Sequence, residues 1–231
     1  MLTVEQYAKL FDYALLAPNL QEADIQKGCE TAIKYNFAAF CVNSCWAELV
    51  CNKLNSTDVM AAITIGYPLG AILSKVKFTE IEECLKFGVK GIDMVINIGA
   101  LKDKNYKLVR NEIREEVKMC KGHALSKVIC EINFLTDDEI IAITKICCEE
   151  EANYVKTSTG MSNFAKYAQI KIMCKALEEQ TKTKLKVSGL HEQFDLAGSL
   201  QVIQMGATLL GTKFAPRLVE EYKEYVKNGK F

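Results

Sequence analysis

Apolar positions along this chain change their spacing repeatedly, from the three-to-four-residue period of a helix to the compact runs of a buried strand. CETAIKYN leads into FAAFCVN, and ECLKFGVK leads into GIDMVIN, with an asparagine or a glycine near the change. These two residue types commonly end helices. The pattern therefore predicts short buried strands that alternate with amphipathic helices.

Eight runs are predicted to form strands, at residues 11–16, 38–43, 61–68, 91–97, 127–133, 153–159, 184–189 and 208–214. Helical spacing is found at residues 24–35, 73–87, 109–121, 137–150 and 165–179. Such alternation predicts a parallel sheet, because each return to a parallel strand needs a crossover helix.

About eight strand–helix units in 231 residues predict a (β/α)8 TIM barrel, with a short N-terminal helix before the first strand. We expect one domain over residues 1–231. A doubly wound open sheet is the alternative, but it usually has a glycine-rich loop after its first strand. The segment ALLAPNL has no glycine there.

Composition narrows the range of partners. Twenty-nine basic residues balance 29 acidic ones, so the net charge favours neither nucleic acid nor an anionic membrane as partner. Glu5, Lys9 and Asp12 interrupt the apolar residues near the N-terminus, which fits neither a signal peptide nor a membrane span. We expect a cytoplasmic protein with a small, locally bound ligand.

Ten cysteines raise the question of disulfides or metal. In a cytoplasmic chain of this size we expect reduced thiols that pack as small apolar residues. The closest spacings, Cys41/Cys45 and Cys147/Cys148, are not those of a zinc site, and the chain has only two histidines. We expect no metal.

Lysine occurs in an unusual place in the run NYVKTSTG. Strand alternation puts Lys156 on one face with Tyr154 and Ser158, puts Lys186 on the equivalent face of the next strand, and puts Asp93 on a strand two positions away. If these faces point into a barrel, two lysines and one aspartate converge on one cavity. The alternatives are lysines on outer faces that extend to water, or a structural ion pair with Asp93.

Paired lysines have a chemical use. An ordinary lysine, with a pKa near ~10.4, is neutral in only about four molecules per ten thousand at pH 7. A second ammonium group that lowered this pKa to roughly 7 would raise the neutral fraction about a thousandfold. The sequence therefore predicts Lys156 as a Schiff-base nucleophile, Lys186 as the group that lowers its pKa, and Asp93 with Lys186 as proton donors and acceptors.

Four further polar residues near strand ends are candidates for the pocket: Asp12, Cys41, Asn43 and Glu131. Asp12 either bonds within the site or ends a strand. Cys41 has no histidine in a recognisable relation to it, so a core thiol is favoured over a reactive one. A barrel ion pair with a lysine explains Glu131 as well as a direct role does.

Several segments together resemble the deoxyribose-phosphate aldolase family. They are DYALL (12–16), ITIGYPLG (63–70), GIDMVINIGALKDKNY (91–106), KVICEINFLTDDEI (127–140) and KTSTG (156–160). The resemblance spans nearly the whole chain. It implies a (β/α)8 barrel that reversibly cleaves 2-deoxy-D-ribose 5-phosphate without metal or organic cofactor, within deoxyribonucleotide catabolism. It assigns the Schiff base to Lys156, the second lysine to Lys186 and the proton relay to Asp93, and it implies a homo-oligomer, a dimer or tetramer.

Departures from the family pattern lie where the family holds phosphate. Leu190 follows Gly189 in place of a second glycine, and Lys213 with Phe214 follows Gly211-Thr212. Beyond Gly160 the residues are also larger than usual in the family. We expect Gly160, Gly189, Gly211 and Lys213 to bind the substrate phosphate, with Lys213 as a point charge that replaces lost backbone contacts.

Three other hypotheses stay open. The first is an aldolase for an aldehyde or sugar without phosphate. The second is a metal-dependent lyase or isomerase, which the shortage of histidine disfavours. The third is a non-catalytic barrel that binds a sugar phosphate.

Overall fold

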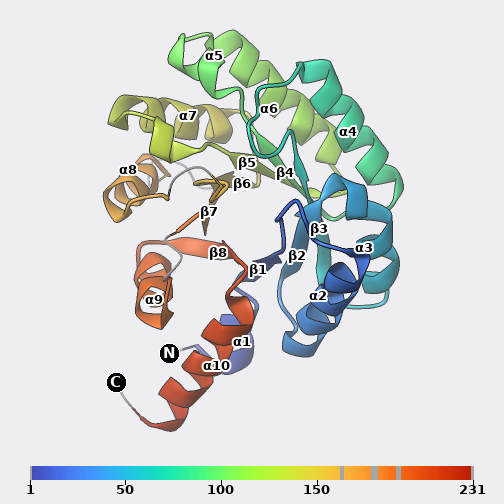
Figure 1. Ribbon diagram of the computed structural model, residues 1–231. Coiled ribbons are helices and arrows are strands. Elements are labelled where there is room, and N and C mark those ends of the chain that lie inside the picture. Colours follow the sequence, from blue (N-terminus) through green and yellow to red (C-terminus); the bar gives the residue numbers. More distant parts are fainter. Residues whose placement is uncertain (1, 162–163, 178–181, 191–193, 230–231) are drawn as a thin grey trace.

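Eight parallel strands close into a barrel in the computed structural model, which describes residues 2–161, 164–177, 182–190 and 194–229 (Figure 1). The strands are β1 Phe11–Ala14, β2 Ala39–Asn43, β3 Met60–Ile65, β4 Gly91–Val95, β5 Leu125–Ile129, β6 Tyr154–Lys156, β7 Lys184–Ser188 and β8 Ala207–Thr212. Each strand pairs with the next, and β8 pairs with β1. The predicted (β/α)8 barrel is confirmed.

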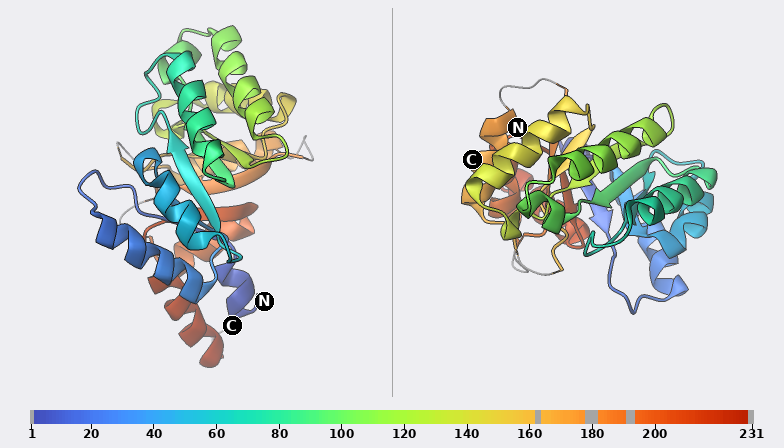
Figure 2. Two further views of the ribbon diagram at one scale, coloured as in Figure 1. Left: turned by 90° about the vertical axis from the view of Figure 1, so that its right-hand side faces the viewer. Right: turned by 90° about the horizontal axis from the view of Figure 1, so that it is seen from above.

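Helices surround this barrel in all three views (Figures 1 and 2). They are α1 Val4–Ala8, α2 Glu22–Tyr35, α3 Ala47–Leu54, α4 Ser74–Lys86, α5 Ile98–Lys102, α6 Tyr106–Cys120, α7 Asp137–Glu149, α8 Tyr167–Leu177, α9 Leu196–Gln204 and α10 Ala215–Lys227. The predicted short helix before the first strand is α1. The last two positions of the predicted helix 165–179 lie outside the described residues. No described helix is both long enough and apolar enough to span a bilayer.

Local sequence sets several helix ends. Thr136 begins α7 with a reciprocal capping box, in which its hydroxyl accepts from the Glu139 N–H and the Glu139 carboxylate accepts from the Thr136 N–H. Asn36 ends α2 in the left-handed conformation, with φ of 51°. These ends matter for the site, because they fix where each connection enters the next strand.

Several predicted strands extend too far at their carboxyl ends. The run 127–133 ends as a strand at Ile129, because Glu131 takes a left-handed conformation and Ile132–Phe134 form a 3₁₀ turn. Likewise β6 ends at Lys156, although Thr157 and Ser158 are buried. The apolar pattern could not separate these residues from the strand, because the connections that follow are themselves buried.

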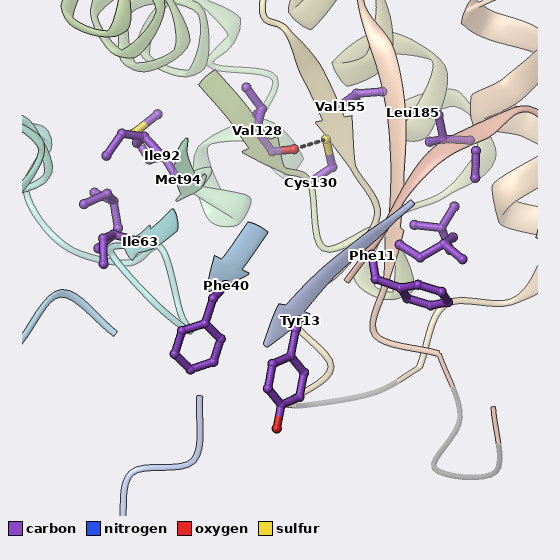
Figure 3. Close-up of a cluster of buried hydrophobic side chains, with 14 of the residues drawn as sticks. Phe11, Tyr13, Phe40, Ile63, Ile92, Met94, Val128, Cys130, Val155 and Leu185 are labelled. Carbon is purple, nitrogen blue, oxygen red and sulfur yellow. Dashed lines mark hydrogen bonds between the residues drawn. The ribbon is translucent and has the colours of Figure 1, made fainter. Parts of the chain in front are cut away.

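Large apolar side chains cover the outer faces of the strands, where the helices pack. Figure 3 shows this layer, which includes Phe11, Tyr13, Phe40, Ile63 and Ile92. Phe40 and Tyr13 stack with ring centroids 5.3 Å apart. The outer faces therefore supply most of the apolar core.

Small residues line the opposite, inner faces. Ala39, Cys41 and Ala62 form a separate small apolar cluster. At Gly91, a Cβ atom would lie 2.6 Å from the Lys127 ammonium nitrogen, a distance that such atoms do not tolerate. The barrel interior therefore has room for long polar side chains, which is the feature that builds the site.

Candidate active site

Five charged side chains meet inside the barrel: Asp12 from β1, Asp93 from β4, Lys127 from β5, Lys156 from β6 and Lys186 from β7. Each is at most 3% exposed. Strand register places Lys156 opposite Lys186, and Asp93 opposite Lys127. Buried charges on this scale persist only when they are paired.

Asp93 is the centre of the cluster. Its Oδ2 atom accepts hydrogen bonds from the Lys156 Nζ at 2.7 Å and from the Lys186 Nζ at 2.6 Å. Its Oδ1 atom accepts from the Lys127 Nζ at 2.8 Å. One carboxylate oxygen is thus shared by the two lysines that strand alternation selects.

Asp12 completes the cluster from the opposite direction. Its Oδ2 atom accepts from the Lys127 Nζ at 3.1 Å and also from the Lys186 Nζ. Three ammonium groups then face two carboxylates. One positive charge is therefore buried without a matching carboxylate. This favours the neutral form of one of the three lysines.

The pKa values follow from this arrangement. Burial opposes the charge of Asp93, but the ammonium groups of Lys127, Lys156 and Lys186 outweigh it and hold the pKa of Asp93 well below its ordinary value. Burial also opposes the charge of Lys156, yet Asp93 outweighs it and raises the Lys156 pKa. For Lys186 burial dominates and, with the neighbouring Lys127 and Lys156, lowers the pKa.

This result corrects one prediction from the sequence. The sequence predicts that Lys186 lowers the pKa of Lys156, whereas the structure places the lowered pKa on Lys186 itself. The reason is that burial opposes the charge of both amines, but Asp93 outweighs burial at Lys156, whereas at Lys186 the Lys127 and Lys156 charges add to it. Alternation along the strands correctly predicts which charged residues lie together, but it does not predict which of their effects on the lysine pKa values is larger.

Lys127 is the member of the cluster that the sequence reasoning misses. It falls within a predicted strand but is absent from the predicted site. The signal was present, because the alternation that selects Lys156 and Lys186 also places Lys127 on the inner face of β5.

Two of the pocket candidates have mainly structural surroundings. Burial, followed by the charges of Asp93 and Asp12, raises the pKa of the Cys41 thiol to about 12, which keeps it protonated. The Asn43 amide donates to the Leu16 carbonyl oxygen at 3.2 Å and so fastens the segment after β1.

Glu131 lies just beyond β5 and is 1% exposed. Its Oε2 atom accepts from the Thr159 N–H at 3.1 Å, and within the described part of the chain no ion pair joins it to a lysine. Burial raises the pKa of this carboxyl group. Glu131 therefore holds the segment that follows Lys156, rather than pairing with a barrel lysine.

A cavity of about 230 Å³ opens at the carboxyl ends of the strands. Its lining includes all four residues expected to bind phosphate, Gly160, Gly189, Gly211 and Lys213. Thr159, also in the lining, lies three residues beyond Lys156 in the chain. The segment that follows β6 therefore connects the lysine cluster to the cavity along the chain.

The glycines of this cavity have a steric reason as well. Gly160 and Gly189 have φ of 79° and 65°. A Cβ atom on Gly189 would lie 2.8 Å from the Gly160 nitrogen, and one on Gly211 would lie 2.9 Å from the Ser188 Cβ. These positions require glycine for backbone conformation and close approach, whatever ligand binds.

Apolar side chains form much of the remaining wall: Met161, Phe164, Leu190, Phe194 and Phe214. Lys213 is the charged residue among the described residues of the lining, and its ammonium nitrogen lies 5.2 Å from the centre of the Phe214 ring. Within the described ranges no group of three or more His, Cys, Asp or Glu side chains is placed to hold a metal ion. Lys213 therefore gives one end of this otherwise largely apolar cavity a positive charge.

A closed parallel barrel whose strand ends bring lysines and carboxylates together is the architecture of a lysine-dependent barrel enzyme. The chain is 40% identical over 216 residues to the deoxyribose-phosphate aldolase of Clostridium tetani, covering 93% of this chain and 98% of that one. It is 40% identical over 205 residues to the deoxyribose-phosphate aldolase of Mycoplasma capricolum, covering 88% and 90%. A scan of protein-family models finds none that matches.

Solved structures agree with these relatives. An aldolase named QR15 superposes with a TM-score of 0.89 at 28% identity and covers 100% of both chains. The tetrameric deoxyribose phosphate aldolase of Aeropyrum pernix superposes with a TM-score of 0.87, covers 96% of this chain and 92% of that one, and at 22% identity supports the fold alone. The chain belongs to the deoxyribose-phosphate aldolase family, and it is a carbon–carbon lyase.

Proposed function

We propose that this chain reversibly cleaves 2-deoxy-D-ribose 5-phosphate to D-glyceraldehyde 3-phosphate and acetaldehyde, through a Schiff base on Lys156 and without a metal. The observation that carries the proposal is the sharing of the Asp93 Oδ2 atom between Lys156 and Lys186 at the end of β6. The named activity of the relatives supports the choice of substrate.

The shared oxygen solves the problem posed by the raised pKa of Lys156. A charged lysine cannot attack a carbonyl, so Lys156 must first lose a proton. The Asp93 Oδ2 atom contacts both nitrogens, and Lys186 is the lysine whose pKa is lowered. A proton can therefore pass from Lys156 through Asp93 to a neutral Lys186, which leaves a neutral amine on Lys156.

The same groups serve the later steps. The Lys156 amine adds to the C1 aldehyde, the resulting carbinolamine loses water, and a protonated imine forms. The C3 hydroxyl then loses its proton as the C2–C3 bond breaks, which releases glyceraldehyde 3-phosphate and leaves an enamine. Protonation at C2 and addition of water release acetaldehyde. Asp93 and Lys186 supply and accept these protons.

The phosphate group of the substrate is assigned to the Lys213 end of the cavity. A phosphate beside Lys213 would be paired with a cation, while the apolar wall limits competing water. We place this reaction in deoxyribonucleotide catabolism in the cytoplasm. The substrate is the small-molecule partner, and nucleic acid and membrane are not.

We also propose that the chain forms a homo-oligomer, a dimer or tetramer. An apolar surface patch, defined as Leu69, Ile72, Leu73 and Val76, supports this proposal, because its side chains are 66%, 39%, 76% and 49% exposed. The patch lies before and at the start of α4, next to Lys75, while Glu82 and Glu83 lie toward the other end of the helix. Two copies packed with antiparallel α4 helices would bring opposite charges together.

Borohydride trapping tests the covalent step. Reduction in the presence of acetaldehyde should add a two-carbon unit to Lys156, located by mass spectrometry of peptides, and Lys156→Met should remove both the adduct and the cleavage activity. Lys184, an exposed lysine at the start of β7, provides the matched control. Lys184→Met should keep both, and an active chain without a Lys156 adduct contradicts the proposal.

Substrate comparison tests the phosphate assignment. The wild-type chain should cleave deoxyribose 5-phosphate with a kcat/KM at least about tenfold above that for free deoxyribose, since a charge-assisted contact contributes on the order of 1.5 kcal/mol or more. Lys213→Met should lose this preference while its rate with free deoxyribose stays the same. Equal wild-type rates on the two sugars would favour a non-phosphorylated substrate.

A further inference from the structure

Tyr67 is a polar residue of the cavity that the proposed reaction steps do not use. It follows β3 and lines the cavity together with Thr159. Its hydroxyl group donates a hydrogen bond to the Thr159 carbonyl oxygen at 3.1 Å. This bond joins the connection after β3 to the segment that follows Lys156.

The bond also fixes what Tyr67 can offer a ligand. A phenol has one hydrogen, and here that hydrogen is used by Thr159. Burial raises the pKa of Tyr67, so the group stays a neutral phenol and its oxygen keeps lone pairs that can accept. Tyr67 therefore presents a hydrogen-bond acceptor to the cavity, and its natural partner is a hydroxyl group.

The chemistry of cleavage decides which substrate hydroxyl fits. The C3 oxygen gives its hydrogen to a base when the C2–C3 bond breaks and becomes a carbonyl, so a neutral phenol, which is too weak a base to take that proton, would lose its hydrogen bond there. The C4 hydroxyl keeps its hydrogen throughout and becomes the 2-hydroxyl of glyceraldehyde 3-phosphate. An acceptor beside C4 is favourable before and after cleavage.

Position in the cavity agrees with C4. In the proposed function Lys156 holds C1 and Lys213 holds the phosphate on C5. Tyr67 shares the cavity wall with Lys213, and the Lys156 charge is the first electrostatic influence on its hydroxyl. Tyr67 therefore lines the cavity assigned to the phosphate end of the substrate and lies near enough to Lys156 for that charge to act on its hydroxyl group.

We infer that Tyr67 is a specificity-determining residue whose phenolic oxygen accepts a hydrogen bond from the C4 hydroxyl of the sugar phosphate. The ligand class that it selects is an aldehyde with a hydroxyl on the carbon next to the carbonyl. This inference rests on the proposed function, because it uses the same substrate and the same amine.

The condensation direction allows a sharp test. Acetaldehyde is the donor, and the acceptors are D-glyceraldehyde 3-phosphate and 3-oxopropyl phosphate, which lacks the hydroxyl but keeps the phosphate. For Tyr67→Phe, kcat/KM with the hydroxylated acceptor should fall about 3- to 10-fold, the value of one neutral hydrogen bond, while kcat/KM with 3-oxopropyl phosphate stays within about twofold. Thermal unfolding and borohydride trapping at Lys156 check that the variant is folded and has a reactive amine.

Tyr13→Phe is the matched control. Tyr13 lies on the outer face of β1 against Phe37 and Phe40, away from the cavity, and its variant should behave as wild type with both acceptors. An equal loss of kcat/KM with both acceptors in Tyr67→Phe would show that the phenol only holds Thr159 in place. No loss with either acceptor would show that the phenol does not contact the substrate hydroxyl. Both outcomes overturn the inference. A wild-type chain that condenses neither acceptor contradicts the proposed function itself, and the inference with it.

Discussion

At the scale of single residues, Lys127 shows how the site depends on charge balance rather than on two lysines alone. Burial opposes its charge, but Asp12 and Asp93 outweigh this effect and raise the Lys127 pKa. Lys127 is therefore the fixed cation of the cluster. Its charge lets Asp12 and Asp93 stay ionised, and it contributes to the lowered pKa of Lys186.

Replacing Lys127 by methionine tests this role. The two aspartates would lose one buried partner, and we expect the free energy of unfolding to fall by about 3–5 kcal/mol, the usual cost of breaking a buried ion pair from one side. We also expect kcat/KM for cleavage to fall and its pH profile to shift, because Lys186 loses a neighbouring charge. Denaturant titration and pH-dependent cleavage rates measure the two effects.

Lys184→Met is again the comparison for Lys127→Met, because it removes an exposed lysine from the same kind of secondary structure. Its unfolding free energy should stay within about 0.5 kcal/mol of wild type, as is usual for surface changes. An unchanged stability and pH profile in Lys127→Met would argue against a fixed cation.

The same residues show what sequence can and cannot predict. Alternation in short strands is a geometric rule, so the spacing of Lys156, Lys186 and Asp93 is enough to place them together. The order of their pKa values depends on the balance between burial and several neighbouring charges at each amine, and no spacing encodes this balance. Tyr67 belongs to the same category, because its role depends on which way one hydrogen points.

At the scale of elements, the carboxyl ends of β6 and β7 come unusually close together. Gly160 and Gly189 lie in the segments just beyond these two strands, and both have positive φ. The family resemblance assigns these glycines to phosphate, but the structure gives them a packing requirement of their own. The strand register ends at the pair of Lys156 and Lys186, and the contact between the two glycines follows within four residues of it.

Gly189→Ala tests that requirement, with Gly88→Ala as its control. Both glycines have positive φ, 65° and 89°, but a Cβ atom on Gly88 would meet nothing within 4 Å. Gly88→Ala should cost only the conformational penalty of about 1–3 kcal/mol. Gly189→Ala should cost about 1–3 kcal/mol more from overpacking and should lower cleavage activity. Equal losses of unfolding free energy in both variants would argue against the close contact.

A second contact between elements links α6 to β5 through a buried carboxyl group. Glu116 on α6 is 0% exposed, and its Oε1 atom accepts the backbone N–H of Lys127 at 3.1 Å. Burial, the largest influence, raises its pKa well above the ordinary value of 4.5. The folded protein therefore keeps this proton at pH values where the unfolded chain has released it.

The sign of the pH dependence follows. The contribution of Glu116 to stability is complete below pH 4.5, and it is lost as pH rises from there toward the folded-state pKa. Glu116→Gln should remove this loss, so its stability relative to wild type should improve by about 1.4 kcal/mol per pH unit across that window. Denaturant titrations at successive pH values measure it. Glu48→Gln, at an exposed position on α3, is the control, and a pH-independent difference for Glu116→Gln would contradict the argument.

At the scale of the whole molecule, the barrel separates two kinds of packing. The outer faces of the strands carry the large apolar residues that hold the helices, while the inner faces carry small residues and the ion cluster. This division is why the fold could be predicted from apolar periodicity alone. A surface through which copies of the chain would meet leaves no comparable trace, because an exposed apolar residue has the same spacing as a buried one.

The apolar patch around the start of α4 makes the proposed association of copies testable. Leu73→Glu places a charge at its most exposed position, 76% exposed at the N-cap of α4. A carboxylate is favourable at a helix start, so the variant should stay folded. Light scattering after size exclusion should then give the mass of one chain for Leu73→Glu and a multiple of 25.9 kDa for wild type.

Ile33→Glu separates a specific interface from a general effect of surface charge. Ile33 is 42% exposed but lies on α2, away from the patch, so its variant should keep the wild-type mass. If Leu73→Glu also keeps that mass, copies meet through another surface. If only Leu73→Glu is monomeric, its cleavage rate becomes informative, because α4 follows the connection that carries Tyr67, and the Glu80 carboxylate on α4 accepts the Gly66 N–H at 2.9 Å. If Leu73→Glu lowers kcat/KM only with the hydroxylated acceptor, then association of the copies affects the part of the active-site wall that carries Tyr67.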